Sequence, residues 1–335
     1  MLYVSTRNRM DSYTAYRALH EDLAPDGGMF LPFRLPQLSE EEIRLFRSRS
    51  FGDNIAEILN LFFSAKLTGW DVEFCCGRYP IKHIDLTRRL IVVESWHNTA
   101  ASYAYMEQAL NSRLCGDANK KHISSWAQIA INIAYLFAVW GSCQFTDVDQ
   151  PLDIAVDATS SATPIAAWYA RKMGLPIGTV ICGSVGSSAA WDLIHRGELS
   201  GSVPAGERRA LEQLVYATLG RSEAEKFAAA GTQNRPYLIP EDSLNTLNEG
   251  ISVAVVSKDR IASVISSFYR SNHYVLDTSA AVAFAALQDH RAKIGESNQT
   301  IISSMINPAK HMRGIGEMLG LSTEELEKVV NQQRG

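Results

Sequence analysis

Three residues near the ends of predicted strands have side chains that suit acid–base chemistry. His97 follows a short apolar segment, and imidazole is the side chain that most readily exchanges protons near neutral pH. Asp157 ends a second apolar segment and could orient His97 or act as its partner base. Ser160 could serve as a nucleophile beside an imidazole, although no GxSxG turn surrounds it. Each has a plainer alternative, such as a loop hydrogen bond for His97 or an exposed loop position for Asp157.

The segment Asp153–Ser184 must position two of these residues, and its pattern predicts strand, loop, helix and strand. Thr163 and Pro164 are typical of the N-cap and first residue of a helix, and Gly174 is typical of its end. Such a βαβ unit has parallel strands, and ligands bind beyond their carboxyl ends. The loop 158–163 is therefore predicted to face a ligand, although a hydroxyl-rich helix cap without a ligand is equally compatible with the motif.

Composition and charge limit the classes of protein to which this chain can belong. The chain has 335 residues, of which 46% are hydrophobic and 20% charged, as in globular proteins with a large core. A net charge of −4 gives no electrostatic reason to expect nucleic acid or an anionic membrane as partner. The longest apolar run, Ile129–Trp140, is too short to span a bilayer and contains Asn132. The start of the chain lacks an apolar signal segment, so a cytoplasmic location is expected.

The five cysteines are scattered and odd in number, which favours reduced thiols and no metal site. Two units are expected to pack as one compact body, a helical N-terminal segment over 1–85 and an α/β core over 86–335. Strands are predicted at 89–94 and 300–305. Helices are predicted at 12–23, after Ser39, at 52–66, 100–112, 124–140, 187–195, 206–219, 222–230, from 241, at 258–269 and 278–292, and after Ser322.

Several segments, in this order along the chain, resemble the threonine synthase family. They are YVSTR (3–7), LAPDGGMFLPFRLPQLSEEEI (23–43), WAQIAINIAYLF (126–137), AWYARKMGLPI (167–177), ERRALEQLVYATLGRSEAEKF (207–227), YVLDTSAAVAFAAL (274–287) and SSMINPAK (303–310). The resemblance implies a tryptophan-synthase-β-like (fold type II) α/β fold with a mainly parallel sheet flanked by helices. The family converts phosphohomoserine to threonine with pyridoxal phosphate held by a lysine.

The motifs that carry this chemistry are altered. The family's motif LFHGPTLAFKD aligns with SWHNTAASYAY, so its histidine falls on His97 and its cofactor lysine on Ala104. The glycine-rich phosphate loop aligns with residues 159–163, which contain no glycine. Further departures from the family pattern fall at Gln128, Ser279 and Met305. Only the segment from Tyr105 to Lys121 stands where the family has its small domain, so that domain is predicted to be largely deleted. The resemblance thus implies loss of the cofactor, and none is expected.

The polar residues around the former site still favour a function. A vacated cavity in a purely structural protein should fill with apolar side chains. The residues predicted to bind a ligand are polar, and they are Asn98, Thr99, Ser102, Thr159, Ser161, Thr163, Ser184 and Lys310. The expected function is therefore an enzyme or binder of a small polar molecule, with elimination, isomerisation or cyclisation chemistry of a kind that would suit specialised metabolism. The alternative is an inactive relative that acts through protein contacts, and a homodimer is compatible with both.

Overall fold

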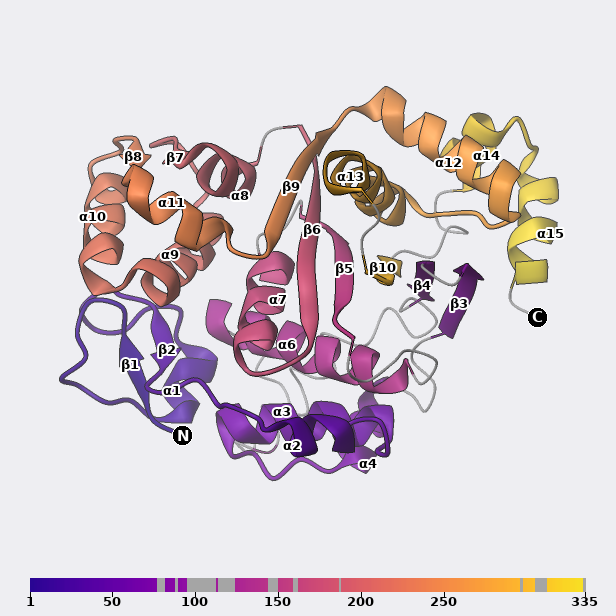
Figure 1. The fold of residues 1–335 in the computed structure, drawn as a ribbon. Coiled ribbons are helices and arrows are strands. Elements are labelled where there is room, and N and C mark those ends of the chain that lie inside the picture. Colours follow the sequence, from indigo (N-terminus) through magenta and orange to yellow (C-terminus); the bar gives the residue numbers. More distant parts are fainter. Residues whose placement is uncertain are drawn as a thin grey trace.

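A six-stranded sheet forms the centre of the fold in the computed structural model (Figure 1), in the order β3-β4-β10-β5-β6-β9. The structure describes residues 1–76, 82–87, 90–94, 113, 124–143, 150–158, 162–186, 188–295, 298–304 and 312–333. The strands are β3 (Lys82–Thr87), β4 (Leu90–Glu94), β5 (Leu152–Asp157), β6 (Ile177–Val185), β9 (Ile251–Val256) and β10 (Thr300–Ser304). All neighbours are parallel except β3, which runs antiparallel to β4. The predicted α/β fold with a mainly parallel sheet is confirmed.

The parallel strands end together along one side of the sheet, which we call the carboxyl edge. Glu94 at the end of β4 is paired in register with Ser304 at the end of β10. Asp157 at the end of β5 is paired with Gly183 of β6. The predicted βαβ unit is therefore present, and Asp157 lies at the edge where ligands bind in open parallel sheets.

Helices cover both faces of the sheet because each strand presents apolar residues to both sides. Val93, Ile154 and Ile301 face the layer formed by α6 (Ser125–Ser142) and α7 (Ala162–Lys172), and α3 (Phe51–Phe63) packs against α6. Residues of opposite parity, including Val92 and Ile302, face α12 (Lys258–Asn272) and α13 (Thr278–Ile294). The apolar helix predicted at 124–140 is confirmed as α6.

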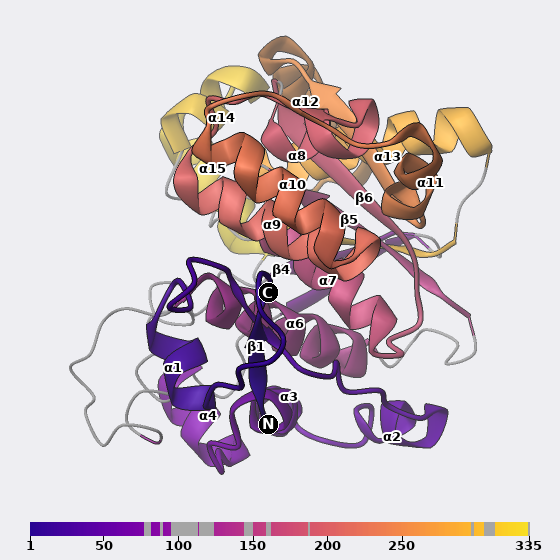
Figure 2. The same ribbon diagram turned by 90° about the vertical axis from the view of Figure 1, so that its left-hand side faces the viewer.

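The N-terminal elements lie beside the α6 layer, below the core in the turned view (Figure 2). They are β1 (Tyr3–Ser5), α1 (Ala15–His20), β2 (Phe30–Pro32), α2 (Glu40–Leu45), α3 and α4 (Gly69–Cys76). Trp126 of α6 joins these elements to the core, since its ring contacts Tyr3, Phe62 and Tyr169 at centroid distances of 6.5, 5.4 and 5.5 Å. The division of the chain between residues 85 and 86 stays a prediction.

Helix caps follow the sequence closely. The Ser39 side chain accepts from the Glu42 backbone N–H while the Glu42 carboxylate accepts from the Ser39 backbone N–H, which is the expected capping box. The predicted caps Ser257 and Asp277 are also confirmed. Helix α7 differs from the prediction, because it begins at Ala162 and places Thr163 inside its first turn. Pro164 still fits there, since the first turn has no intrahelical partners for its backbone N–H groups.

Two further groups of elements complete the fold. Between β6 and β9 lie α8 (Ala189–Trp191), a π-helical turn η1 (Asp192–Arg196), β7 (Glu198–Leu199), α9 (Ala205–Leu219), α10 (Arg221–Thr232), β8 (Tyr237–Leu238) and α11 (Glu241–Asn248). The chain ends with α14 (Met312–Leu319) and α15 (Thr323–Gln333). Strand β9 was not predicted from the sequence. No helix in the described part of the chain is long and apolar enough to cross a bilayer.

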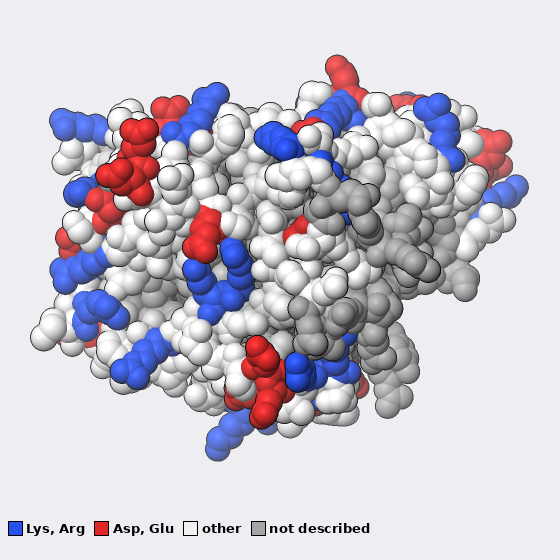
Figure 3. Space-filling model, viewed as in Figure 1, with Lys and Arg blue, Asp and Glu red and all other residues white. Residues whose placement is uncertain are grey.

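Charges are mixed over the surface in Figure 3, where acidic and basic groups alternate on the face shown. This distribution agrees with the small net charge of −4. Four acids of the described residues are buried instead, namely Glu94, Asp153, Glu212 and Asp277. Glu212 of α9 is 5% exposed, and its Oε1 accepts a hydrogen bond of 2.7 Å from the Thr6 hydroxyl. The Arg7 guanidinium lies 3.7 Å from Oε2. Burial raises the pKa of Glu212 above its ordinary value, although Thr6 and Arg7 oppose the shift.

Replacing Glu212 by glutamine should stabilise the protein increasingly as the pH rises. Because the pKa is raised on folding, the folded chain holds this proton more tightly than the unfolded chain does. Stability is therefore lost as the pH rises from the unfolded value of about 4.5 through the raised value. We expect the free energy of unfolding of the variant to exceed that of the natural protein by about 1 kcal/mol near neutral pH. Urea unfolding at several pH values measures this difference.

Glu223→Gln is the matched control with the opposite sign. Its hydrogen bond from Lys226 lowers the pKa of Glu223, so its contribution to stability is present above the unfolded pKa and lost in acid. That variant should become relatively less stable as the pH rises. If Glu212→Gln followed the same trend as Glu223→Gln, attraction from Arg7 would outweigh burial at Glu212.

Candidate functional site

Three of the eleven predicted site residues belong to the described part of the chain, namely Asp157, Thr163 and Ser184. The other predicted site residues lie outside it, and so does Ala104. They are His97, Asn98, Thr99, Ser102, Thr159, Ser160, Ser161 and Lys310. Their roles stay predictions.

The three described residues lie at or next to the carboxyl edge, but they do not form one cluster. Asp157 is half-buried at the end of β5. Ser184 near the end of β6 is 3% exposed and donates its hydroxyl to the Gly186 carbonyl at 3.0 Å. Thr163 in the first turn of α7 and Ser184 line two different pockets. The predicted convergence of hydroxyls on one ligand is thus not seen for this pair.

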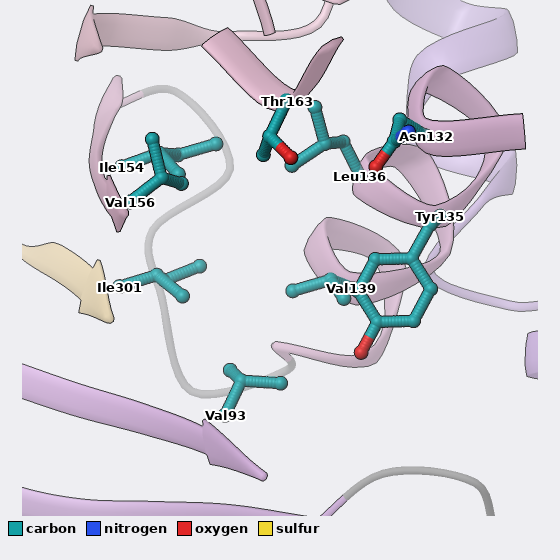
Figure 4. Close-up of a pocket in the computed structure, with 9 residues that line it drawn as sticks. All are labelled: Val93, Asn132, Tyr135, Leu136, Val139, Ile154, Val156, Thr163 and Ile301. Carbon is teal, nitrogen blue, oxygen red and sulfur yellow. The ribbon is translucent and has the colours of Figure 1, made fainter. Parts of the chain in front are cut away.

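The larger of these pockets, which we call the α6 pocket, lies between α6 and the sheet (Figure 4). It has an empty volume of about 440 Å³, part of which is open to solvent. The described residues that line it are Val93, Asn132, Tyr135, Leu136, Val139, Ile154, Val156, Thr163 and Ile301. Alternate residues of β4, β5 and β10 point the same way, and α6 contributes four residues at helical spacing. The regular geometry of strand and helix therefore builds most of its wall.

Polar groups are few in the α6 pocket. Asn132 is 8% exposed, and its Nδ2 donates to the Gln128 carbonyl one turn earlier in α6 at 2.8 Å. In Figure 4, Asn132 and Thr163 lie toward one end of the pocket, whereas Val93 lies toward the other. None of the nine described lining residues carries a formal charge. The described lining therefore offers hydrogen-bonding groups on Asn132 and Thr163 at one end, a hydroxyl on Tyr135 nearer the other end, and apolar contact elsewhere.

The smaller pocket has an empty volume of about 210 Å³ and lies between the start of α7 and α8. Its described lining residues are Ala158, Pro164, Cys182, Ser184, Ser188, Ala190, Trp191, Ile194 and Val253. Burial raises the pKa of the Cys182 thiol to about 12, so this thiol is protonated and a poor nucleophile near neutral pH. The hydroxyl of Ser188 is used as the cap of α8, where it accepts from the Trp191 backbone N–H. This pocket therefore offers no free acid, base or nucleophile among its described residues.

Sequence reasoning missed one buried acid at the carboxyl edge. Glu94 is 2% exposed, and one of its carboxylate oxygens accepts a 2.5 Å hydrogen bond from the Tyr274 hydroxyl. Glu94 is also paired in register with Lys82, the first residue of the antiparallel strand β3. The signal was an acid at the end of the otherwise apolar strand sequence LIVVE. A buried acid at that position needs a donor, and Tyr274 supplies it.

The fold places the chain in the class of fold type II α/β proteins. Threonine synthase from Brucella melitensis, whose structure is described as bound to pyridoxal phosphate, superposes with a TM-score of 0.79 at 17% identity, over 96% of this chain and 92% of that one. Yeast threonine synthase gives a TM-score of 0.79 at 17% identity, over 98% of this chain and 94% of that one.

Sequence comparison specifies the relationship further. Residues 2–78 match the family model for the threonine synthase N terminus. Threonine synthase-like 2 from Xenopus laevis is 20% identical, over 84% of this chain and 83% of the relative. Human threonine synthase-like 2 is 30% identical over 120 residues, which are 33% of this chain and 24% of the relative. The chain is thus threonine synthase-like, as the sequence motifs predicted.

The described pocket residues do not fit pyridoxal phosphate held as it is in a lysine-dependent enzyme. That cofactor needs an amine for its aldehyde and hydrogen-bond donors or cations for its phosphate. None of the described residues that line either pocket is a lysine or an arginine. Within the described residues there is also no group of three His, Cys, Asp or Glu side chains that could hold a metal ion.

Proposed function

We propose that this threonine synthase-like chain binds a small molecule in the α6 pocket and has lost pyridoxal phosphate-dependent catalysis. The observation that carries the proposal is that no described residue lining the pocket is charged, together with alanine at the position of the family's cofactor lysine. An apolar pocket with a few polar groups is the usual form of a small-molecule site. A cavity without a ligand would instead cost stability in proportion to its volume.

The proposed chemistry is acid–base catalysis without a cofactor, of the lyase or isomerase type. His97 would act as the general acid or base, Asp157 would orient it, and Ser160 would bind or attack the substrate. The position of Asp157 at the carboxyl edge supports its part, since the chain also leaves β4 for residue 97 at this edge. If purified protein retains a molecule that it turns over, His97→Ala should abolish turnover while leaving binding in place. Unchanged turnover would remove His97 from the chemistry.

The loss of lysine-bound cofactor is tested with the full chain and the variant Ala104→Lys. Both are incubated with pyridoxal phosphate, reduced with borohydride and mapped by peptide mass spectrometry. The natural protein should carry no stoichiometric label, whereas the variant restores an amine at the family's position and should be labelled at residue 104. Stoichiometric labelling of one lysine in the natural protein would overturn the proposal and identify a replacement lysine. Native mass spectrometry of the unreduced sample shows any other small molecule that is retained.

A second candidate function, as an inactive relative acting through protein contacts, is favoured by two aromatic residues on α4. Trp70 and Phe74 are 69% and 77% exposed, and their rings stack at a centroid distance of 5.4 Å. Exposed Trp and Phe side chains are enriched at the centres of protein interfaces. Light scattering measures the oligomeric state of the natural protein and of the variant Trp70→Ser, and so tests this second function. A dimer that dissociates in the variant would support this function and the predicted homodimer, and a monomer in both would count against it.

A further inference from the structure

The kind of molecule that suits the α6 pocket follows from its walls. Six of its nine described lining residues are branched aliphatic residues from β4, β5, β10 and α6. Val93, Ile154 and Ile301 are no more than 4% exposed, so they form a rigid, dry wall rather than a flexible surface. An unpaired carboxylate or phosphate loses its hydration on entering such surroundings, which costs several kcal/mol or more. The apolar wall therefore disfavours binding of a charged ligand.

The acids at the carboxyl edge add to this selection. Two of the parallel strands end in an ionisable residue, β4 in Glu94 and β5 in Asp157, and both residues are acids. Electrostatic attraction of an anion into the α6 pocket thus has no source among its described lining residues or at these two strand ends.

The polar end of the pocket is suited to a neutral hydrogen-bonding group. Asn132 is the one carboxamide among the four described α6 residues that line the pocket, beside Tyr135, Leu136 and Val139, and a leucine in its place would pack without any polar cost. Its carboxamide and the Thr163 hydroxyl each combine donor and acceptor capacity, and both lie toward the same end in Figure 4. A neutral amide, alcohol or carbonyl matches such a pair better than a charged group does.

We infer that the α6 pocket takes a neutral, mainly apolar small molecule with a hydrogen-bonding group that contacts Asn132 and Thr163. The inference rests on the proposed function and names the class of molecule for the same pocket. It separates this chain from a protein that acts on phosphorylated amino acids. It also revises the ligand expected from the sequence, which was a small polar molecule.

Two probes of nearly the same shape test the inference, isovaleramide and isovalerate. Both have the same branched carbon skeleton, but near neutral pH the first is neutral and the second anionic. NMR titration of the full chain should give a roughly millimolar dissociation constant for the amide, as expected for so small a molecule. The carboxylate should bind at least tenfold more weakly. Equal or tighter binding of isovalerate, or no binding of isovaleramide, would overturn the inference.

Variants of pocket residues test whether the amide binds in the α6 pocket. Val139→Phe fills the pocket and should abolish amide binding, whereas Val255→Phe adds the same bulk to a residue of β9 that is 41% exposed and should change nothing. Asn132→Leu should weaken the amide about tenfold and reduce its advantage over the carboxylate, because one net hydrogen bond is lost. Leu136→Phe replaces Val139→Phe if that variant does not unfold cooperatively. Amide binding that survives in a folded, filled variant would refute the assignment to this pocket.

Different results would contradict this inference and the proposed function. If native mass spectrometry finds a charged molecule that is retained by the natural protein and lost in Val139→Phe, the pocket binds a ligand but the inferred class is wrong. If neither a retained molecule nor either probe depends on the pocket, both proposals fail.

Discussion

Replacing Trp126 by alanine is expected to lower the free energy of unfolding by about 3–5 kcal/mol. The Trp126 side chain is 0% exposed and sits edge-on against three rings from β1, α3 and α7. Removing it leaves a cavity where the N-terminal elements meet the α/β core, and the surrounding helices cannot collapse fully into it. The loss should affect both parts of the molecule, because they share this contact.

Urea unfolding measures this loss with two signals, far-UV circular dichroism and thiol labelling of Cys182. This cysteine is buried in the core at 2% exposure, so labelling reports opening of the sheet region. Trp126→Phe keeps a ring in the same position and serves as the control, with a much smaller expected loss. Both signals should change together in every variant. If the labelling transition stayed at its natural position in Trp126→Ala, the N-terminal elements would not be coupled to the core.

Tyr274→Phe is expected to cost about 2–3 kcal/mol, although it removes a single oxygen atom. The Tyr274 hydroxyl is the donor to Glu94 at 2.5 Å, and both residues are at most 3% exposed. Without this donor a buried carboxylate loses part of its compensation for lost water. The double variant with Glu94→Gln should lose clearly less than the sum of the single losses, because both single changes break one interaction.

Tyr237→Phe provides the matched comparison. Tyr237 also donates to a glutamate, at 2.9 Å to Glu223, but that side chain is 14% exposed and also pairs with Lys226. Water and the lysine can replace the phenol there, so a loss below about 1 kcal/mol is expected. Thermal and urea unfolding of both phenylalanine variants settle the comparison. Equal losses would mean that Glu94 does not depend on Tyr274.

Local sequence signals predicted most helices well. Ile55, Ile58, Leu59 and Phe62 occur at helical spacing and all are buried in α3. Ser39, Ser257 and Asp277 each cap the helix that follows, as their side chains predicted. These features depend on neighbours within about four residues, so the chain itself contains the whole signal. The parallel βαβ unit was predictable for the same reason.

Features set by distant parts of the chain were not predicted. Strand β9 has only six residues, all apolar except Ser252, so periodicity does not identify it, and pairing with β6 decides its conformation. The antiparallel strand β3 likewise depends on pairing with β4. The α6 pocket combines residues from β4, α6, β5, α7 and β10, and which strand residues face α6 follows from the register. Alignment of motifs pointed to Thr163, which lines this pocket, but not to the aliphatic wall.

The position of β10 has a consequence for biosynthesis. This strand is the last of the sheet to be synthesised, yet it lies between β4 and β5 and pairs with both. Until residues 300–304 emerge from the ribosome, the nascent chain has two half-sheets, one from β3 and β4 and one from β5, β6 and β9, each with an unpaired apolar edge. Strand β10 follows β4 by some 200 residues in the chain, and its insertion must then join the two half-sheets. A chain terminated before residue 300 would keep nearly all its helices and still be unable to close its sheet, which makes it a natural client of chaperones.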